Sequence, residues 1–260
     1  MGWFNNLVYS SLGKKLIMAV LGLFLTLFLV VHLAGNLQLL LNDGGYMFNR
    51  YADFMSHNPL IEFIAIFTFL SFALHSLIGL ALYIKNKKAR PKGYAKVRSQ
   101  SHSWTSNNMT ILGLLILVFL VFHLKNFYFQ YKFGEVPQQG YAVFKVDGQK
   151  QVYPASNGQE AIEYIQQNFA NQEINSFQFK TFKNLYLVVN TAYEELWYVV
   201  IYVLAMALVA FHLWHGFASG FQTIGLKHPK FLPLVKTIGY IISILLPMGF
   251  AMIPIYMYLT

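Results

Sequence analysis

The chain alternates between long apolar runs and short polar segments, and one polar segment is much longer than the others. About 20 apolar residues are enough for a helix to cross a hydrocarbon core of ~30 Å. Five runs reach that length, at about residues 15–41, 60–85, 108–131, 195–222 and 232–259. We therefore predict an all-α integral membrane protein, a five-transmembrane-helix bundle that forms a single membrane-embedded domain over residues 1–260.

The long polar segment, residues 132–193, separates the third and fourth spans. Residues on either side of Asp147-Gly148 alternate between apolar and polar, which predicts a β-hairpin with a two-residue turn. Apolar residues at helical spacing predict a short amphipathic helix over 158–170, and a second interfacial helix is expected near 184–192. This segment is interpreted as a small polar extracytoplasmic insertion.

The remaining connections are short. Lys14 and Lys15 precede the first run as in a signal peptide, but the run lacks a cleavage site and is interpreted as an uncleaved helix. Residues 46–60 are interpreted as a connector between the first two spans. Pro247 and Pro254 predict kinks in the last span.

Composition agrees with a membrane protein. Apolar residues make up 56% of the chain and charged residues 11%, outside the range of soluble domains. The absence of cysteine excludes disulfides, iron–sulfur clusters held by this chain's thiolates and covalently attached haem. No glycine-rich nucleotide-binding motif is present, membrane lipid is the expected environment, and we expect no nucleic-acid partner.

Charge predicts the orientation. The N-terminal segment, residues 85–98 and residues 227–236 hold twelve of the 19 basic residues and no acid. The alternate segments hold all ten acids. Because cytoplasmic loops are enriched in lysine and arginine, we expect a cytoplasmic N-terminus and an extracytoplasmic C-terminus in a bacterial cytoplasmic membrane.

A histidine lies inside each of the first four predicted spans, at His32, His75, His123 and His212. The hydrocarbon core offers an imidazole no water, so such residues normally face the bundle interior and have a function. Any one of them is equally well explained as a satisfied core residue or a proton relay. Four at two matched depths favour a shared function.

Residue counts give these depths. His32 and His123 lie about 17 and about 15 residues from the cytoplasmic ends of their helices, in the outer half of the bilayer. His75 and His212 each lie about ten residues from theirs, so the two levels are about 10 Å apart. We predict two b-type haems, one held by His75 and His212 on the cytoplasmic side and one by His32 and His123 on the outer side.

A neutral imidazole binds iron through one nitrogen and donates a hydrogen bond from the other, to a helix carbonyl or to a hydroxyl such as that of Ser71. With both axial positions filled, the iron carries electrons and has no open site for oxygen. Gly35, Gly79 and Gly216 follow three of the histidines on the same helical face and are expected to give a flat macrocycle clearance. The third span has no such glycine.

His215 lies three residues after His212, on nearly the same face. It is an alternative iron ligand or a contact to the haem. His212 is favoured because it matches the depth of His75 and is followed by Gly216. His57, His102 and His228 lie in connectors and are interpreted as solvated.

Several short motifs carry a family resemblance. They are His32-Leu-Ala-Gly-Asn36, Leu74-His75-Ser-Leu-Ile-Gly79, Phe122-His123 and Phe211-His212-Leu-Trp-His-Gly216-Phe217. In this order on five helices, they resemble the di-haem cytochrome b subunit, the membrane anchor of succinate dehydrogenase and fumarate reductase. The resemblance covers nearly all of the chain except 132–193, which is longer than the family pattern implies.

This resemblance implies the haem pairing given above. It also implies that the cytoplasmic face docks an iron–sulfur subunit bound to a flavoprotein that interconverts succinate and fumarate. The basic 85–98 segment fits such a face, and equally an ordinary cytoplasmic loop. The chain would exchange electrons with a quinone, by analogy menaquinone. Glu62 is the nearest candidate for a glutamate tied to quinol oxidation, and a stabilising charge at a helix N-terminus is the alternative interpretation.

Other functions remain open from the sequence. A di-haem cytochrome b of a hydrogenase or formate dehydrogenase has the same chemistry and different soluble subunits. A proton-coupled transporter would use the histidines without haem, although the chain shows no internal repeat of the kind many transporters have. A haem-free anchor that only holds an enzyme at the membrane is a further alternative.

Overall fold

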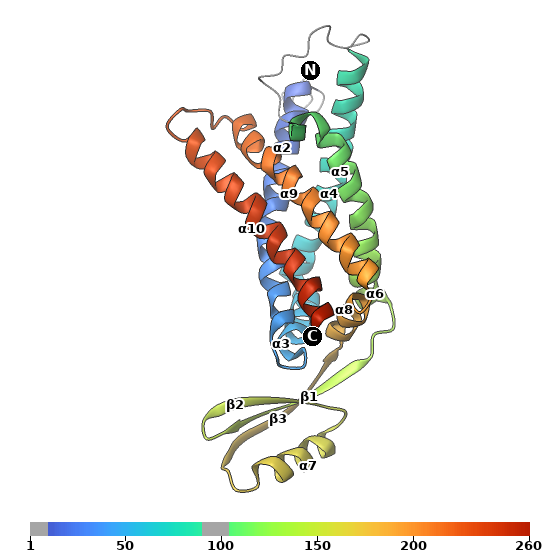
Figure 1. Ribbon diagram of the computed structural model, residues 1–260, viewed down its shortest axis with the longest axis vertical. Coiled ribbons are helices and arrows are strands. Elements are labelled where there is room, and N and C mark those ends of the chain that lie inside the picture. Colours follow the sequence, from blue (N-terminus) through green and yellow to red (C-terminus); the bar gives the residue numbers. More distant parts are fainter. Residues whose placement is uncertain (1–9, 90–103) are drawn as a thin grey trace. The chain divides into compact units, whose positions relative to one another are not determined.

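The computed structural model describes residues 10–89 and 104–260, whose course is shown in Figure 1. Within these ranges, five helical stretches are long and apolar enough to cross a membrane. They are α2 (Ser11–Asn36) with the 3-10 helix η1 (Leu37–Leu40), α4 (Pro59–Lys88), α5 (Trp104–His123) with the π-helix η2 (Leu124–Phe129) and α6 (Gln130–Phe133), α9 (Leu196–Thr223) and α10 (Leu232–Leu259). The prediction of a helical, multi-pass membrane protein with five spans is confirmed.

The other elements lie in the two connections that follow η1 and α6. They are α3 (Tyr46–His57), β1 (Gln138–Val146), β2 (Gln149–Ala155), α7 (Gly158–Phe169), β3 (Ile174–Lys183) and α8 (Leu185–Tyr193). We call β1, β2, α7 and β3 the cap.

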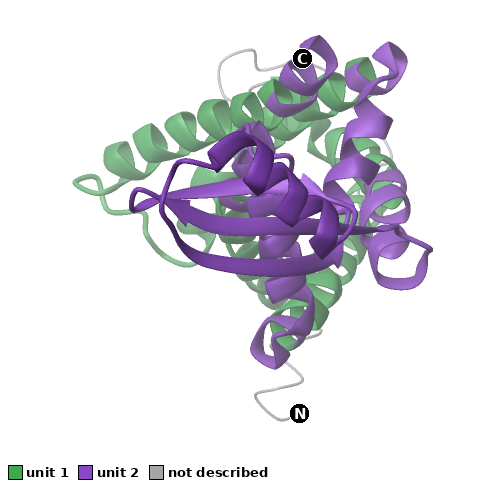
Figure 2. Ribbon diagram, turned by 90° about the horizontal axis from the view of Figure 1, so that it is seen from below, with its two compact units in different colours: residues 1–33, 63–121, 200–252 green, residues 34–62, 122–199, 253–260 purple. Residues whose placement is uncertain are grey.

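The chain divides into two compact units, coloured separately in Figure 2. Unit 1 comprises residues 1–33, 63–121 and 200–252, so it contains part of every long helix. Unit 2 comprises residues 34–62, 122–199 and 253–260, so it contains α3, the cap, α8 and the adjoining helix ends. Many large apolar side chains of the long helices are exposed, as expected for surfaces that face lipid.

The predicted hairpin is present in the cap. β1 pairs with β2 in antiparallel register, with Val146 opposite Gln149. Asp147 (φ 49°) and Gly148 (φ 79°) form the two-residue turn, and positive φ at both positions matches the type I′ turn that Asp-Gly favours. β1 pairs on its other side with β3, so the strand order is β2-β1-β3.

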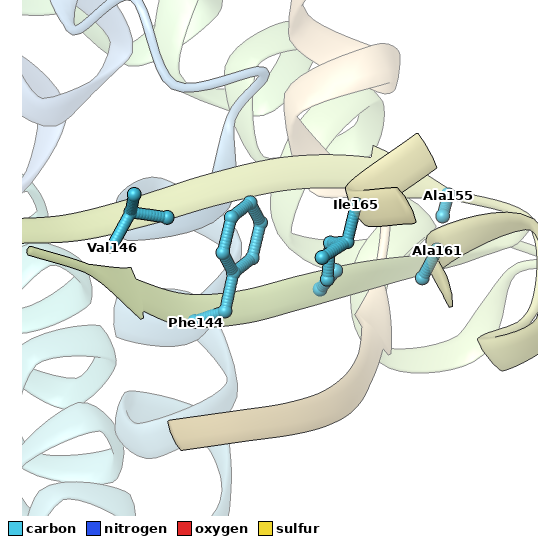
Figure 3. Close-up of a cluster of buried hydrophobic side chains, with 6 residues drawn as sticks. Phe144, Val146, Ala155, Ala161 and Ile165 are labelled. Atoms are coloured by element: carbon cyan, nitrogen blue, oxygen red, sulfur yellow. The ribbon is translucent and has the colours of Figure 1, made fainter. Parts of the chain in front are cut away.

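The predicted amphipathic helix is α7, which covers one face of this sheet. Asn157 accepts hydrogen bonds from the backbone N–H groups of Gln159 and Glu160 and so caps the helix. Ala161 and Ile165 face the sheet. They complete a core with Ala142, Phe144, Val146 and Ala155, most of which is labelled in Figure 3.

Two elements differ from the expectation. Residues 46–60 are not a simple connector, because α3 occupies 46–57; the Asp43 carboxylate accepts from the backbone N–H groups of Gly45 and Met47 at its start. β3 was not expected at all. Its apolar positions Phe177 and Phe179 alternate with polar ones, but a strand in isolation has no turn signal to mark it.

A buried polar network joins α3 to the cap and to α8. The Asn49 side chain donates to the Tyr141 hydroxyl (2.8 Å) and to the Asn184 side-chain oxygen (3.0 Å), and it accepts from the backbone N–H of Tyr186. Tyr141 donates in turn to the carbonyl of Gly44. Asn49 and Tyr141 are completely buried, so every lost bond leaves an unsatisfied polar group.

We expect Tyr141→Phe to destabilise unit 2. The substitution removes the hydroxyl that satisfies both Asn49 and Gly44, which should cost about 1–3 kcal/mol. Hydrogen exchange of the β1 and β3 amides measures the loss. Tyr153→Phe is the matched control, because Tyr153 is only partly buried and stacks on Tyr164. Equal protection in the two variants would contradict the assigned role.

The same phenol predicts a pH dependence. Burial raises the pKa of Tyr141 from 10.0 to about 12. The folded state favours the neutral phenol. The stabilisation of the folded state that follows from this preference is fully present below the unfolded pKa of about 10. It is lost as the pH rises through about 12. Cap protection followed by hydrogen exchange should therefore fall in that window for the native chain, and the Tyr141→Phe variant should lack this part of the fall.

Candidate functional site

The structure brings two of the predicted histidines together in unit 1. His75 of α4 and His212 of α9 face each other with ring centres 6.3 Å apart and ring planes at 67°. The pair belongs to helices that are far apart in sequence.

The hydrogen bond of His75 is made across helices. Its Nδ1 lies 3.0 Å from the carbonyl oxygen of Met18 on α2. Ser71, the hydroxyl expected from sequence, instead donates to the carbonyl of Phe67. A carbonyl can only accept, so Nδ1 carries the proton and Nε2 is left with its lone pair. That is the form in which an imidazole ligates a metal.

The Nδ1 atom of His212 differs from that of His75. It is buried and has no hydrogen-bond partner within the described part of the chain. An unsatisfied buried polar atom costs about 1–3 kcal/mol, and natural proteins contain few of them.

The spacing of this pair fits a shared metal. Two metal–imidazole bonds of about 2 Å, with about 1 Å more from each nitrogen to its ring centre, place the ring centres roughly 6 Å apart. The observed 6.3 Å matches this value. In the described residues, no group of three or more His, Asp and Glu side chains could hold a metal ion. Two protein imidazoles at this separation are compatible with a prosthetic group that brings the remaining metal ligands, as haem does.

Two glycines that sequence reasoning missed lie against these rings. A Cβ on Gly22 of α2 would stand 3.0 Å from Cε1 of His75, and a Cβ on Gly113 of α5 would stand 3.4 Å from Cε1 of His212. Each histidine thus packs against a glycine of a neighbouring helix. Both glycines lie in the middle of apolar runs, but only the packing shows which histidine each one faces.

The glycines predicted to give clearance contact other groups. A Cβ on Gly35 would overlap the ring of Tyr51, one on Gly79 would lie 3.7 Å from Sδ of Met18, and one on Gly216 would lie 3.6 Å from Cε of Met109. Met18 is also the residue whose carbonyl receives the His75 hydrogen bond. A clearance role for these three glycines stays a prediction.

His32 and His123 belong to different units. In unit 1, the His32 ring lies between Phe28 (5.2 Å, stacked) and Phe250 of α10 (5.5 Å). In unit 2, His123 ends α5 and contacts Phe127, which lies in the π-helix η2 that follows at once. Single π-helical segments are often found at functional sites. The pairing of these two histidines stays a prediction.

His215 is partly buried on α9, one turn beyond His212. The ring that His75 contacts is that of His212. His57 and His228 are exposed, and His57 bonds to Asp53. His102 and most of the basic segment, from Arg90 onwards, lie outside the described residues.

Glu62 lies in the first turn of α4, as expected from the sequence. Its carboxylate forms an ion pair with Lys132 at 2.7 Å, and the Lys132 ammonium also lies 3.4 Å from the carbonyl oxygen of Ser56. Sequence reasoning missed this partner because it comes from the end of another span. A role of Glu62 toward quinone stays a prediction.

An apolar groove of about 430 Å³ lies elsewhere in unit 1, between α9 and α10. Its α9 lining includes Ala207, Ala210 and Trp214. At about 100° per residue, these positions are on the face of α9 opposite to His212. The groove is therefore separate from the histidine pair.

The chain matches no family model, no curated protein and no solved structure.

We expect Gly22→Val to displace the His75 imidazole. The new side chain would press on a ring that a Cβ alone already meets at 3.0 Å, and overpacking of this kind costs about 1–3 kcal/mol. Nitrogen NMR of histidine should show loss of the Nδ1–H signal that the Met18 carbonyl holds. Gly79→Ala is the control, since its Cβ meets only the flexible Met18 thioether at 3.7 Å. An unchanged spectrum in Gly22→Val would refute the contact.

Proposed function

We propose that this chain is a di-haem cytochrome b, the membrane anchor and electron-transfer subunit of a succinate:quinone oxidoreductase. In this function it passes electrons between membrane quinone and a peripheral flavoprotein with its iron–sulfur subunit. The observation that carries the proposal is the His75–His212 pair: two imidazoles from different spans at a separation that fits one shared metal.

The residues present fit this role. His75 offers Nε2 because the Met18 carbonyl holds the proton on Nδ1. His212 offers an imidazole with an unsatisfied nitrogen in an apolar interior. When bound, a haem would supply reversible one-electron transfer. His75 and His212 would hold it through their imidazoles, and the chain's part would be to fix the orientation of these rings by hydrogen bonding and packing and to keep water away.

The second haem is assigned to His32 and His123. The aromatic packing of His32 against Phe28 and Phe250 supports a rigid, apolar setting for that imidazole. His123 is followed directly by the π-helix η2. Because π-helical segments are frequent at functional sites, this supports a functional role for His123.

The charge distribution supports an orientation with the N-terminus in the cytoplasm and unit 2, with its cap, outside a bacterial cytoplasmic membrane. Lys85, Lys87 and Lys88 lie in the last turn of α4, where cations are favoured by the helix dipole. Lys85 also donates to the Ser11 hydroxyl at the start of α2 (2.7 Å). We assign the docking of the iron–sulfur subunit and flavoprotein to this basic side.

Quinone, by analogy menaquinone, is the proposed membrane partner. Glu62 remains the candidate for the outer quinone chemistry, and its ion pair with Lys132 supports an ionised carboxylate at the start of α4. A purely structural helix-start charge is the competing interpretation of the same contact.

The purified chain is expected to bind two haems with bis-imidazole spectra, measured by the pyridine haemochrome assay. His212→Ala should remove the inner haem and leave the outer one, while His32→Ala should do the reverse, because an axial ligand cannot be replaced by a methyl group. His57→Ala is the matched control, since that histidine is exposed at the end of α3.

Other results would decide against the proposal. A colourless protein would remove the haem assignment and favour a proton-coupled transporter. Loss of haem from His215→Ala but not from His212→Ala would move the ligand to His215. Co-purification with hydrogenase or formate dehydrogenase subunits would keep the haems and change the enzyme.

A further inference from the structure

One face of the cap sheet is basic. Residues directly opposite each other in a sheet share a face, and successive residues alternate between faces. Lys145 is opposite Lys150 on β2, and Tyr141 is opposite Lys180 on β3. These three lysines therefore share the face that does not carry Phe144, whose side chain is in the core under α7. No strand position on this face is an Asp or Glu. We call it the lysine face.

The strands themselves place no acidic residue on the lysine face. Like charges directly opposite each other on neighbouring strands destabilise a sheet, and Lys145 and Lys150 are such a pair. Asp147 in the adjoining turn forms no ion pair with either lysine; the ion pairs within residues 10–89 and 104–260 are those of Lys132 and His57. The lysines thus keep a positive surface that an external anion would neutralise.

Contacts within unit 2 show where this face points. Tyr141 bonds to Asn49 of α3 and to Gly44, and the Lys150 ammonium lies 4.8 Å from the centre of the Tyr46 ring. α3 joins two spans, so it lies at the level where spans end. Within unit 2, the lysine face is therefore the face of the sheet that lies on the α3 side.

The chain also holds the cap close to the level where the spans end. β1 begins at Gln138, five positions after Phe133 ends a span, a reach of at most about 18 Å. On the other face of the sheet, α7 carries Glu160 and Glu163, and Figure 1 shows α7 on the side of the sheet away from α3. The cap thus carries the lysines on its α3 side and these two carboxylates on its α7 side.

We propose that the lysine face binds the headgroups of anionic phospholipids in the leaflet beside the cap. A phosphodiester with net negative charge complements the three ammonium groups, and a zwitterionic headgroup does so less well. One lysine near an anionic membrane surface strengthens binding about fivefold. The inference does not depend on haem or on the proposed enzyme.

The test uses the full chain in detergent, and it exploits the absence of cysteine. An environment-sensitive fluorophore is attached at Ser176→Cys, a position opposite Lys145 on the lysine face. Short-chain phosphatidylglycerol, phosphatidylcholine and inorganic phosphate are titrated separately. We expect phosphatidylglycerol to bind at least about fivefold more tightly than phosphatidylcholine. In ~1 M salt, where screening acts within about 3 Å, the difference should disappear.

Variants separate this surface from other basic regions. Lys145→Gln with Lys180→Gln, which spares the Lys150–Tyr46 contact, should reduce the preference for phosphatidylglycerol to the part that Lys150 alone supplies. The control removes three charges from the end of α4, with Lys85→Gln, Lys87→Gln and Lys88→Gln, and should leave it unchanged. A fluorophore at Gln167→Cys on α7 should not respond.

Three results would overturn the proposal. They are equal affinity of the native chain for the two lipids, a preference that is not reduced by Lys145→Gln with Lys180→Gln, and a response to inorganic phosphate as strong as that to phosphatidylglycerol. The last would identify a site for a free anion. None of these results depends on haem content, so they leave the proposed electron-transfer function untouched.

Discussion

An imidazole inside a hydrocarbon core must find its hydrogen-bond partners or ligands within the protein. The arrangement of His75 and His212 follows from that constraint. His75 meets it with the Met18 carbonyl of another helix. His212 meets it only in part, because its Nδ1 is buried without a partner within the described residues. The two rings nevertheless face each other at a separation suited to a shared metal. The separation of the two rings and the hydrogen bond of His75 are the observations on which the proposed metal ligation rests.

In unit 2, buried polar groups outside the spans are satisfied by other side chains of the protein. The connections outside the spans bury backbone and side-chain polar atoms, and Asn49, Tyr141 and Asn184 satisfy one another across α3, β1 and the start of α8. A fully paired network of this kind specifies one arrangement, because each alternative leaves a buried group unsatisfied. It makes the cap a defined structure attached to the helix ends.

Local signals were sufficient for much of the fold. The spans were predictable because apolar length alone identifies a membrane helix, and the hairpin because Asp147-Gly148 matches its turn type. α3 and β3 were missed. The signal for α3 was present in Asp43, whose carboxylate accepts hydrogen bonds from backbone N–H groups at the start of the helix. β3 becomes a strand by pairing with β1, a contact that its own sequence does not encode locally.

The amino-acid sequence by itself determined the membrane class, the number of candidate spans and the identity of the histidines within them, because these depend on composition and spacing along one helix. Only the tertiary structure decided which groups meet. It placed His75 beside His212, chose Met18 over Ser71 as the hydrogen-bond partner, and set Gly22 and Gly113 against the two rings. Such contacts depend on the rotation and approach of separate helices, which no single segment of sequence specifies.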